Sequence, residues 1–251
     1  SALAAVGVTP EPTAADAQVM DAAPVEAETS LPKKSKGDPL AEPDNGIIEG
    51  RKTFGNIVKY IKMGISSNFG KMFSVLGASA LLPFLPMQPV QILVNNLLYD
   101  FSQTGIPFDH VDQEYLAKPR KWQPDDLQKF MLYIGPISSI FDYATYAVMW
   151  FVFQANTVEQ QALFQTGWFV ESLMTQTLIV YIIRTAKIPF LQSRPALPML
   201  LVTLTIMAVA IYLPFSPIAS ALGFVPLPPQ YFFWLALILS SYCLLTQLVK
   251  T

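Results

Sequence analysis

The chain has 251 residues, of which 52% are hydrophobic and 14% are charged, and its formal net charge is −2. Soluble domains carry about 25% charged residues, so this composition indicates an integral membrane protein and excludes an ordinary soluble domain. The single cysteine, Cys243, and the single histidine, His110, exclude an internal disulfide, a cysteine-based metal site and a histidine cluster.

Residues 1–46 differ from the rest of the chain, because they are a mixture of Ala, Pro, Glu and Asp with no aromatic residue and no apolar periodicity. Such a segment cannot bury enough apolar surface to fold, so it predicts a disordered tail. It also lacks the basic start and apolar core of a signal peptide. We expect its basic cluster, Lys33 to Lys36, to be a solvated patch, with binding to a lipid surface as the alternative.

Residues 47–64 carry apolar side chains at helical spacing, with basic side chains on and around the other face. The segment runs into an apolar stretch without a helix breaker. A basic helix in that position predicts a cytoplasmic stalk that continues into the membrane. The apolar positions are Ile48, Phe54, Ile57, Val58 and Ile61, and the basic ones are Arg51, Lys52, Lys59 and Lys62.

Six apolar stretches follow between residues 65 and 250, and they predict an all-α integral membrane domain built as a six-helix transmembrane bundle. The pair Gly135-Pro136 interrupts the third stretch. Tryptophans near the ends of the stretches are expected to anchor them at the membrane interface. The stretches are residues 65–86, 90–107, 130–153, 167–183, 197–215 and 231–249, and the tryptophans are Trp122, Trp150, Trp168 and Trp234.

Basic residues occur on one side only of this predicted bundle. Apart from those in the tail and Lys71, they lie in the stalk, in the loops after the second and fourth stretches, and at the C-terminus. The three loops at the opposite side contain no Lys or Arg. By the positive-inside rule, both termini are therefore expected in the cytoplasm.

The second stretch places Asn95, Asn96 and Asp100 in an otherwise apolar span. In a helix that begins near Pro89, Asp100 lies about 16 Å along the axis, close to the middle of a hydrocarbon core about 30 Å thick. Asn96 and Asp100 are four residues apart and share a helix face. A carboxylate and an amide oxygen at one point suit a hard cation, and an intramembrane carboxylate indicates an ion path or a proton relay. The alternative is that Asp100 is neutralised by a buried partner and only locks helix packing.

Four further polar residues interrupt the apolar stretches. Asn68 and Lys71 are three residues apart in the first stretch, so they share a helix face and are candidates to face Asp100. Asp142 lies in the third stretch and Glu171 in the fourth. Each of these two carboxyl groups is as suited to satisfying a helix contact as to binding an ion.

The runs ISSNFGK, LLPFLPMQPVQILVNNLLYD and KPRKW resemble the C-terminal membrane half of the P-type cation ATPases. Together with IGPISSIFDYATYAVMWFVF and KIPFLQSR, they are similar to the bacterial magnesium-transporting P-type ATPases over residues 47–250. The resemblance implies that the six stretches are the fifth to tenth transmembrane helices of a pump in the bacterial inner membrane, and that Mg2+ is the transported ion. It also implies a cation site whose metal ligands are Asn68, Asn96 and Asp100, with Asn95 beside them and Glu171 as a weaker addition.

Lys71 departs from the pattern of related pumps. Calcium pumps have a glutamate three residues after the asparagine that corresponds to Asn68, whereas this chain has a positive charge that would repel a dication. We hypothesise that Lys71 pairs with Asp100 when the site is empty. The alternatives are that its side chain snorkels or that it faces a water-filled cavity.

The phosphorylation and nucleotide-binding motifs of these pumps, DKTGT, TGE and GDGxND, do not occur in the sequence. The chain alone is therefore not expected to hydrolyse ATP, which would act only through domains that this chain lacks. The expected partners are the lipid bilayer and an N-terminal pump half, with no nucleic acid. A stand-alone cation channel or carrier and a non-catalytic membrane subunit are the alternative functions.

Overall fold

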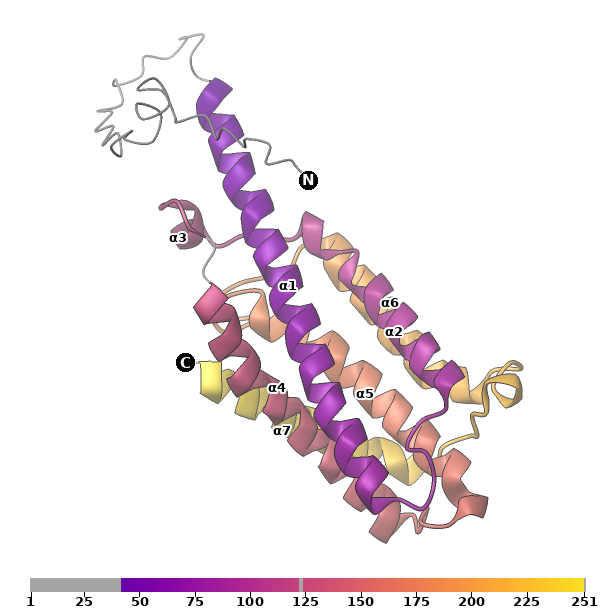
Figure 1. The fold of residues 1–251 in the computed structure, drawn as a ribbon. Coiled ribbons are helices and arrows are strands. Elements are labelled where there is room, and N and C mark those ends of the chain that lie inside the picture. The colour runs from indigo at the N-terminus through magenta and orange to yellow at the C-terminus, as the bar shows by residue number, and fades with distance from the viewer. Residues whose placement is uncertain (1–41, 122–123, 251) are drawn as a thin grey trace, which may run out of the picture. The chain divides into compact units, whose positions relative to one another are not determined.

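The computed structural model describes residues 42–121 and 124–250 (Figure 1). The predicted disordered tail, its basic cluster at residues 33–36 and Trp122 lie outside the described residues, except that residues 42–46 are helical. The described part is mostly α-helical, in agreement with the predicted fold class. Its helices are α1 (Glu42–Leu81), α2 (Pro89–Gln103), α3 (Gln113–Leu116), α4 (Pro124–Ala147), α5 (Gln161–Ile183), α6 (Leu197–Tyr212) and α7 (Pro229–Lys250).

Three segments of the described chain are long and apolar enough to cross a membrane. They are Val158–Ile183, Leu197–Phe215 and Pro229–Lys250, which correspond to α5, α6 and α7 with their flanking turns. These segments agree with the last three of the six predicted stretches. Helix α2 has 15 residues, so it is about 22 Å long and shorter than a hydrocarbon core of about 30 Å.

Helix α1 is a single helix of 40 residues, about 60 Å long, that joins the predicted stalk to the first apolar stretch. It begins at Glu42, before the predicted boundary at residue 47, and ends at Leu81, short of the predicted end at residue 86. The early end has a local cause, because Pro83 and Pro86 cannot continue a helix. In Figure 1, the N-terminal part of α1 extends beyond the ends of the other helices.

Helix α4 continues through Gly135 and Pro136, so the predicted interruption there is wrong. Membrane helices tolerate an internal proline where neighbouring helices satisfy the freed backbone groups. Gly135 is instead required for packing, because a Cβ atom there would lie 2.7 Å from Cδ1 of Phe69 on α1. A Cβ atom at Gly70 on α1 would in turn lie 2.8 Å from the Gly135 carbonyl oxygen. The two glycines let the backbones of α1 and α4 approach closely, as small residues do between membrane helices.

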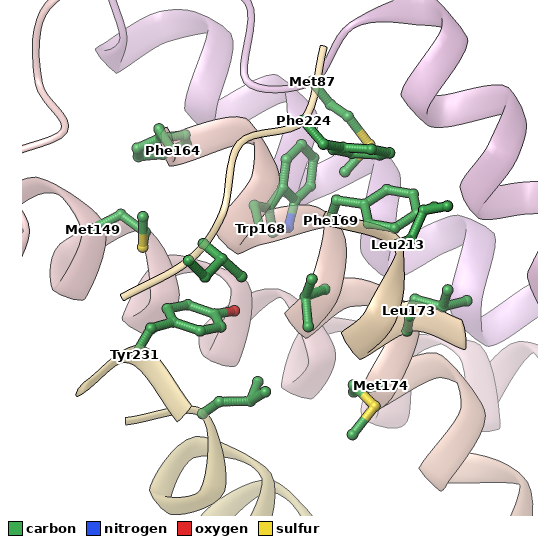
Figure 2. Close-up of a cluster of buried hydrophobic side chains, with 14 of the residues drawn as sticks. Met87, Met149, Phe164, Trp168, Phe169, Leu173, Met174, Leu213, Phe224 and Tyr231 are labelled. Atoms are coloured by element: carbon green, nitrogen blue, oxygen red, sulfur yellow. The ribbon is translucent and has the colours of Figure 1, made fainter. Parts of the chain in front are cut away.

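Helix α5 forms the centre of the structure and packs against α2, α4, α6 and α7. It is buried without a break from Phe164 to Thr177, as expected for a helix surrounded by other helices. Figure 2 shows its side chains Trp168 and Phe169 beside Phe224. Trp168 is 1% exposed and belongs to this core, so its predicted role as an interfacial anchor is wrong.

Candidate cation site

Lys71 connects α1 to Asn95 and Asn96, which we call the polar turn of α2. Its Nζ atom donates hydrogen bonds to the Oδ1 atoms of Asn95, at 2.5 Å, and Asn96, at 3.2 Å. Asn95 is fully buried, and its Nδ2 atom donates at 3.5 Å to the carbonyl oxygen of Phe169 on α5. Two amide oxygens of α2 therefore converge on one point, and the ammonium group of Lys71 lies there.

Asn68, Asn96 and Asp100, the three predicted metal ligands, are all exposed in the described structure. Asn68 lies one turn before Lys71 on α1, and Asp100 lies one turn after Asn96 on α2, so all three follow the same polar strip. The strip is open to the outside of the bundle rather than enclosed by it. Of the predicted set, α2 thus contributes one inward-facing residue, Asn95, and two outward-facing ones.

Asp100 lies close to the end of its helix, because α2 ends at Gln103 and a 3-10 turn, Ile106–Phe108, follows. Asp100 therefore lies in the last turn of a helix shorter than a full-length span, since Gly105 and Pro107 end the helix early. Its depth near the middle of a hydrocarbon core stays a prediction. Asp100 lines a cavity of about 730 Å³ together with residues from the N-terminal part of α1 and from the turn after α2. The cavity thus lies between the C-terminal end of α2 and the N-terminal part of α1.

No ion pair joins Lys71 to Asp100 in the described part of the chain. Lys71 lies level with Asn95 and Asn96, whereas Asp100 is one turn farther along α2, where α1 presents Tyr60 and Ile57 to the cavity. The ammonium group is thus bound to the amide oxygens one turn away from the carboxylate.

Asp142 on α4 is 3% exposed, and both of its carboxylate oxygens have donors. Its Oδ2 atom accepts a hydrogen bond from Ser74 Oγ on α1 at 2.5 Å, and its Oδ1 atom accepts one from Trp168 Nε1 on α5 at 2.8 Å. Asp142 therefore joins three helices. Of the two roles considered for it, these contacts favour the helix contact over ion binding.

Glu171 on α5 is fully buried, and its carboxyl group lies beside the side chains of Asp142 and Thr175. It interacts electrostatically with Asp142, which also lies in the interior. Buried carboxyl groups normally have polar partners, and for Glu171 these are Asp142 and Thr175. It lies on a different helix from the exposed strip of Asn68, Asn96 and Asp100.

Asp109, which the sequence did not single out, is the most highly connected carboxylate in the described structure. It accepts hydrogen bonds from Lys59 Nζ on α1 at 2.9 Å and from Nε and Nη2 of Arg184, at the end of α5, at 2.9 Å each. The backbone N–H of Ala196 donates to it at 3.2 Å. The only signal in the sequence was the occurrence of all these residues in segments predicted to be cytoplasmic.

Asp109, Lys59 and Arg184 form a cluster that we call the Asp109 junction, in which two cations share one carboxylate. Burial raises the pKa of Asp109, but the hydrogen bonds from Arg184 and the charge of Lys59 outweigh it and hold the pKa below its usual value. Burial lowers the pKa of Lys59, and Asp109 offsets this only in part because Arg184 repels the ammonium group. The ionised carboxylate is thus the form that this junction stabilises.

Among residues 42–121 and 124–250, no three His, Cys, Asp or Glu side chains come together as a metal-binding group. The candidate cation site of this chain is therefore an open one, with the carboxylate of Asp100 and the amides of Asn68, Asn95 and Asn96. Hard cations such as Mg2+ and Ca2+ are bound by oxygen ligands of this kind.

The family description "Cation transporting ATPase, C-terminus" matches residues 84–251. The chain belongs to the cation-transporting ATPases. Several bacterial relatives carry the name "Magnesium-transporting ATPase, P-type 1". One from Salmonella typhimurium is 52% identical over 249 residues, which are 97% of this chain and 27% of the relative. One from Escherichia coli is 58% identical over 207 residues, which are 82% of this chain and 23% of the relative.

A more distant member of the cation-transporting ATPases is "Calcium-transporting ATPase 3, endoplasmic reticulum-type" from Arabidopsis thaliana, which is 34% identical over 96 residues, 35% of this chain and 10% of the relative. These matches confirm the resemblance to magnesium-transporting P-type ATPases. The chain spans about a quarter of the length of the curated bacterial relatives it matches, and it corresponds to their C-terminal membrane domain.

Proposed function

We propose that this chain is the cation-transport membrane domain of an ATP-driven Mg2+ importer in the bacterial inner membrane. The observation that carries the proposal is the polar turn of α2, where the amide oxygens of Asn95 and Asn96 converge one turn from Asp100 in a member of this family. Mg2+ keeps part of its hydration shell and is usually held by one or two carboxylates. One carboxylate surrounded by amide oxygens suits a partly hydrated Mg2+ ion.

We further propose that α1, α2, α4, α5, α6 and α7 cross the membrane as six spans with both termini in the cytoplasm. The contacts of Lys250 support this arrangement, because its Nζ atom donates to the carbonyl oxygens of Ile182 and Thr185 at the end of α5. Arg184 at the same end is bound to Asp109, which also binds Lys59 of the stalk. The C-terminus, the end of α5 and the stalk therefore share the side that carries the basic residues.

The exposed strip of Asn68, Asn96 and Asp100 is, in this proposal, one wall of the transport site. The opposite wall comes from an N-terminal pump half, which also contains the domains that use ATP. Exposure of these three polar side chains supports the idea, because polar groups that face lipid are expensive whereas groups that face a partner helix or a water-filled path are not. Conformational changes driven by ATP reach the site through α1, which is continuous from the stalk to Leu81.

The test uses a complete pump, in which the matched 207-residue segment of this chain replaces its counterpart in the E. coli relative. We expect the hybrid to restore Mg2+ uptake and growth at low external Mg2+ to bacteria that lack their own Mg2+ importers. Residues 42–250 expressed alone serve as the control and are expected to restore neither. Failure of a hybrid that accumulates in the membrane contradicts the proposal, and ATP-independent Mg2+ flux through liposomes containing the chain alone supports a channel or carrier instead.

A further inference from the structure

The position of the Lys71 ammonium group is unusual for a lysine in an apolar helix. Such lysines ordinarily extend toward the membrane surface, where the charge remains hydrated. Lys71 instead reaches across to α2 and donates to Asn95 Oδ1 and Asn96 Oδ1 at 2.5 and 3.2 Å. Because the Asn95 side chain is fully buried, its amide oxygen has few other sources of positive charge.

The surroundings of the ammonium group resemble those of a bound cation. Lysine carries a compact positive charge with three donors and no acceptor, so two converging amide oxygens bind it through the same lone pairs that would bind a metal ion. The carboxylates that attract it electrostatically are Asp142, inside the bundle, and Asp100, on the exposed strip. Asp142 joins three helices, whereas Asp100 is assigned to the transport site.

We propose that Lys71 is a tethered cation of the transport site, whose ammonium group occupies the amide oxygens of Asn95 and Asn96 until the transported Mg2+ displaces it. The inference rests on the proposed function, since it assigns a competitor to that same site. In the empty state, Lys71 neutralises the polar turn of α2. During transport, Mg2+ must displace the Lys71 ammonium group from the two amide oxygens. The charge of Lys71 therefore sets the external Mg2+ concentration at which the site fills.

The proposal predicts that removing the charge tightens the apparent binding of Mg2+. Lys71→Met keeps an unbranched side chain without the charge, and Lys71→Gln keeps a donor without the charge. We expect both to lower the half-saturating external Mg2+ concentration for uptake on the order of tenfold, because two nearby like charges no longer repel each other. Lys71→Arg keeps the charge and is expected to behave like the unsubstituted pump.

The measurement is the dependence of Mg2+ uptake on external Mg2+, made on the complete pump in cells that lack other importers. Varying only the external concentration leaves cytoplasmic MgATP constant. Lys129→Met, which removes an exposed lysine from α4, is the matched control and is expected to change nothing. Absence of uptake by the unsubstituted pump contradicts the proposed function itself. Uptake with an unchanged or higher half-saturating concentration in Lys71→Met overturns only the tethered-cation proposal.

Two further outcomes are informative. Loss of uptake in Lys71→Met with normal uptake in Lys71→Arg overturns the proposal, because the charge would then be required rather than displaced.

If Lys71→Met does not accumulate in the membrane, Lys71→Cys in a Cys243→Ser background replaces it. Modification of the introduced cysteine with an aminoethyl thiosulfonate reagent restores the charge and is expected to raise the half-saturating Mg2+ concentration. A neutral methyl thiosulfonate reagent is expected to leave that concentration unchanged. Equal effects of both reagents overturn the proposal.

Discussion

At the scale of single residues, the described structure separates two kinds of charged side chain. Asp109 is bound by two cations and a backbone N–H, so its lone pairs are used for holding segments together. Lys71 and Asp100 lie one turn apart without an ion pair, and the amides of Asn95 and Asn96 lie between α1 and α2. Satisfied charges stabilise the fold, whereas charges with free capacity are available for an ion.

Replacing Asp109 is expected to destabilise the protein more than any exposed substitution. Asp109→Asn leaves Lys59 and Arg184 buried beside a neutral amide, and removing one partner of a buried ion pair costs about 3–5 kcal/mol. The measurement is the melting temperature of the detergent-purified protein at neutral pH. Asp125→Asn, at an exposed position at the start of α4, is the control and should melt like the unsubstituted protein.

The difference in melting temperature between the unsubstituted protein and Asp109→Asn is expected to depend on pH, and its sign follows from the lowered pKa of Asp109. A carboxyl group with a lowered pKa in the folded state stabilises that state fully above its unfolded pKa of about 4, and this contribution is lost as the pH falls through the lowered value. The difference in melting temperature between the unsubstituted protein and Asp109→Asn should therefore narrow in acid. A difference that stays constant from neutral pH to about pH 3 contradicts this assignment.

At the scale of elements, the crossing of α1 and α4 positions the polar interior. Gly70 Cα and the Gly135 carbonyl approach so closely that a Cβ atom at Gly70 would lie 2.8 Å from the carbonyl oxygen. The Ser139 hydroxyl also donates to the Gly70 carbonyl oxygen, at 2.8 Å. One turn farther along α1, Ser74 reaches Asp142. The close approach at the glycines is thus what brings the two polar side chains together.

Gly70→Leu is expected to separate α1 from α4, because the obstructing atom is backbone and cannot rotate away. Overpacking of this kind costs about 1–3 kcal/mol and should lower the melting temperature of the purified protein. Gly50→Leu is the matched control, since it lies on the same helix and a Cβ atom there has nothing within 4 Å. Equal melting temperatures for the two variants would show that the α1–α4 crossing does not depend on the absence of a side chain at residue 70.

Much of the helical architecture could be predicted from apolar stretches and proline positions, and α6 and α7 lie close to their predicted limits. One wrong prediction and one omission have the same cause, which is that spacing along one chain does not reveal what packs against it. Trp168 follows the pattern of an interfacial anchor yet is a buried donor to Asp142. Asp109 binds Lys59, which is 50 positions away in the sequence, and Arg184, which is 75 positions away. Sequence pattern does not predict pairing over such separations.

At the scale of the whole molecule, the described chain is one part of a cation-transporting ATPase whose polar strip faces outward. Its α5 is enclosed on all sides and its core is complete, but Asn68, Asn96 and Asp100 are exposed. A finished core with an open site fits a domain that supplies part of a binding site and receives the rest from another part of the pump. The central claim is that Asp100 supplies the charge for the transported Mg2+.

The most direct test is Mg2+ uptake by the complete pump, compared between the unsubstituted protein, Asp100→Asn and Asp125→Asn. Asp100→Asn keeps the shape of the side chain and removes only its charge, so we predict a loss of uptake of at least about tenfold at low external Mg2+, equivalent to about 1.4 kcal/mol of binding free energy. Asp125→Asn should transport normally. Equal uptake by Asp100→Asn and the unsubstituted pump, at equal amounts in the membrane, would contradict the assignment of the site to α2.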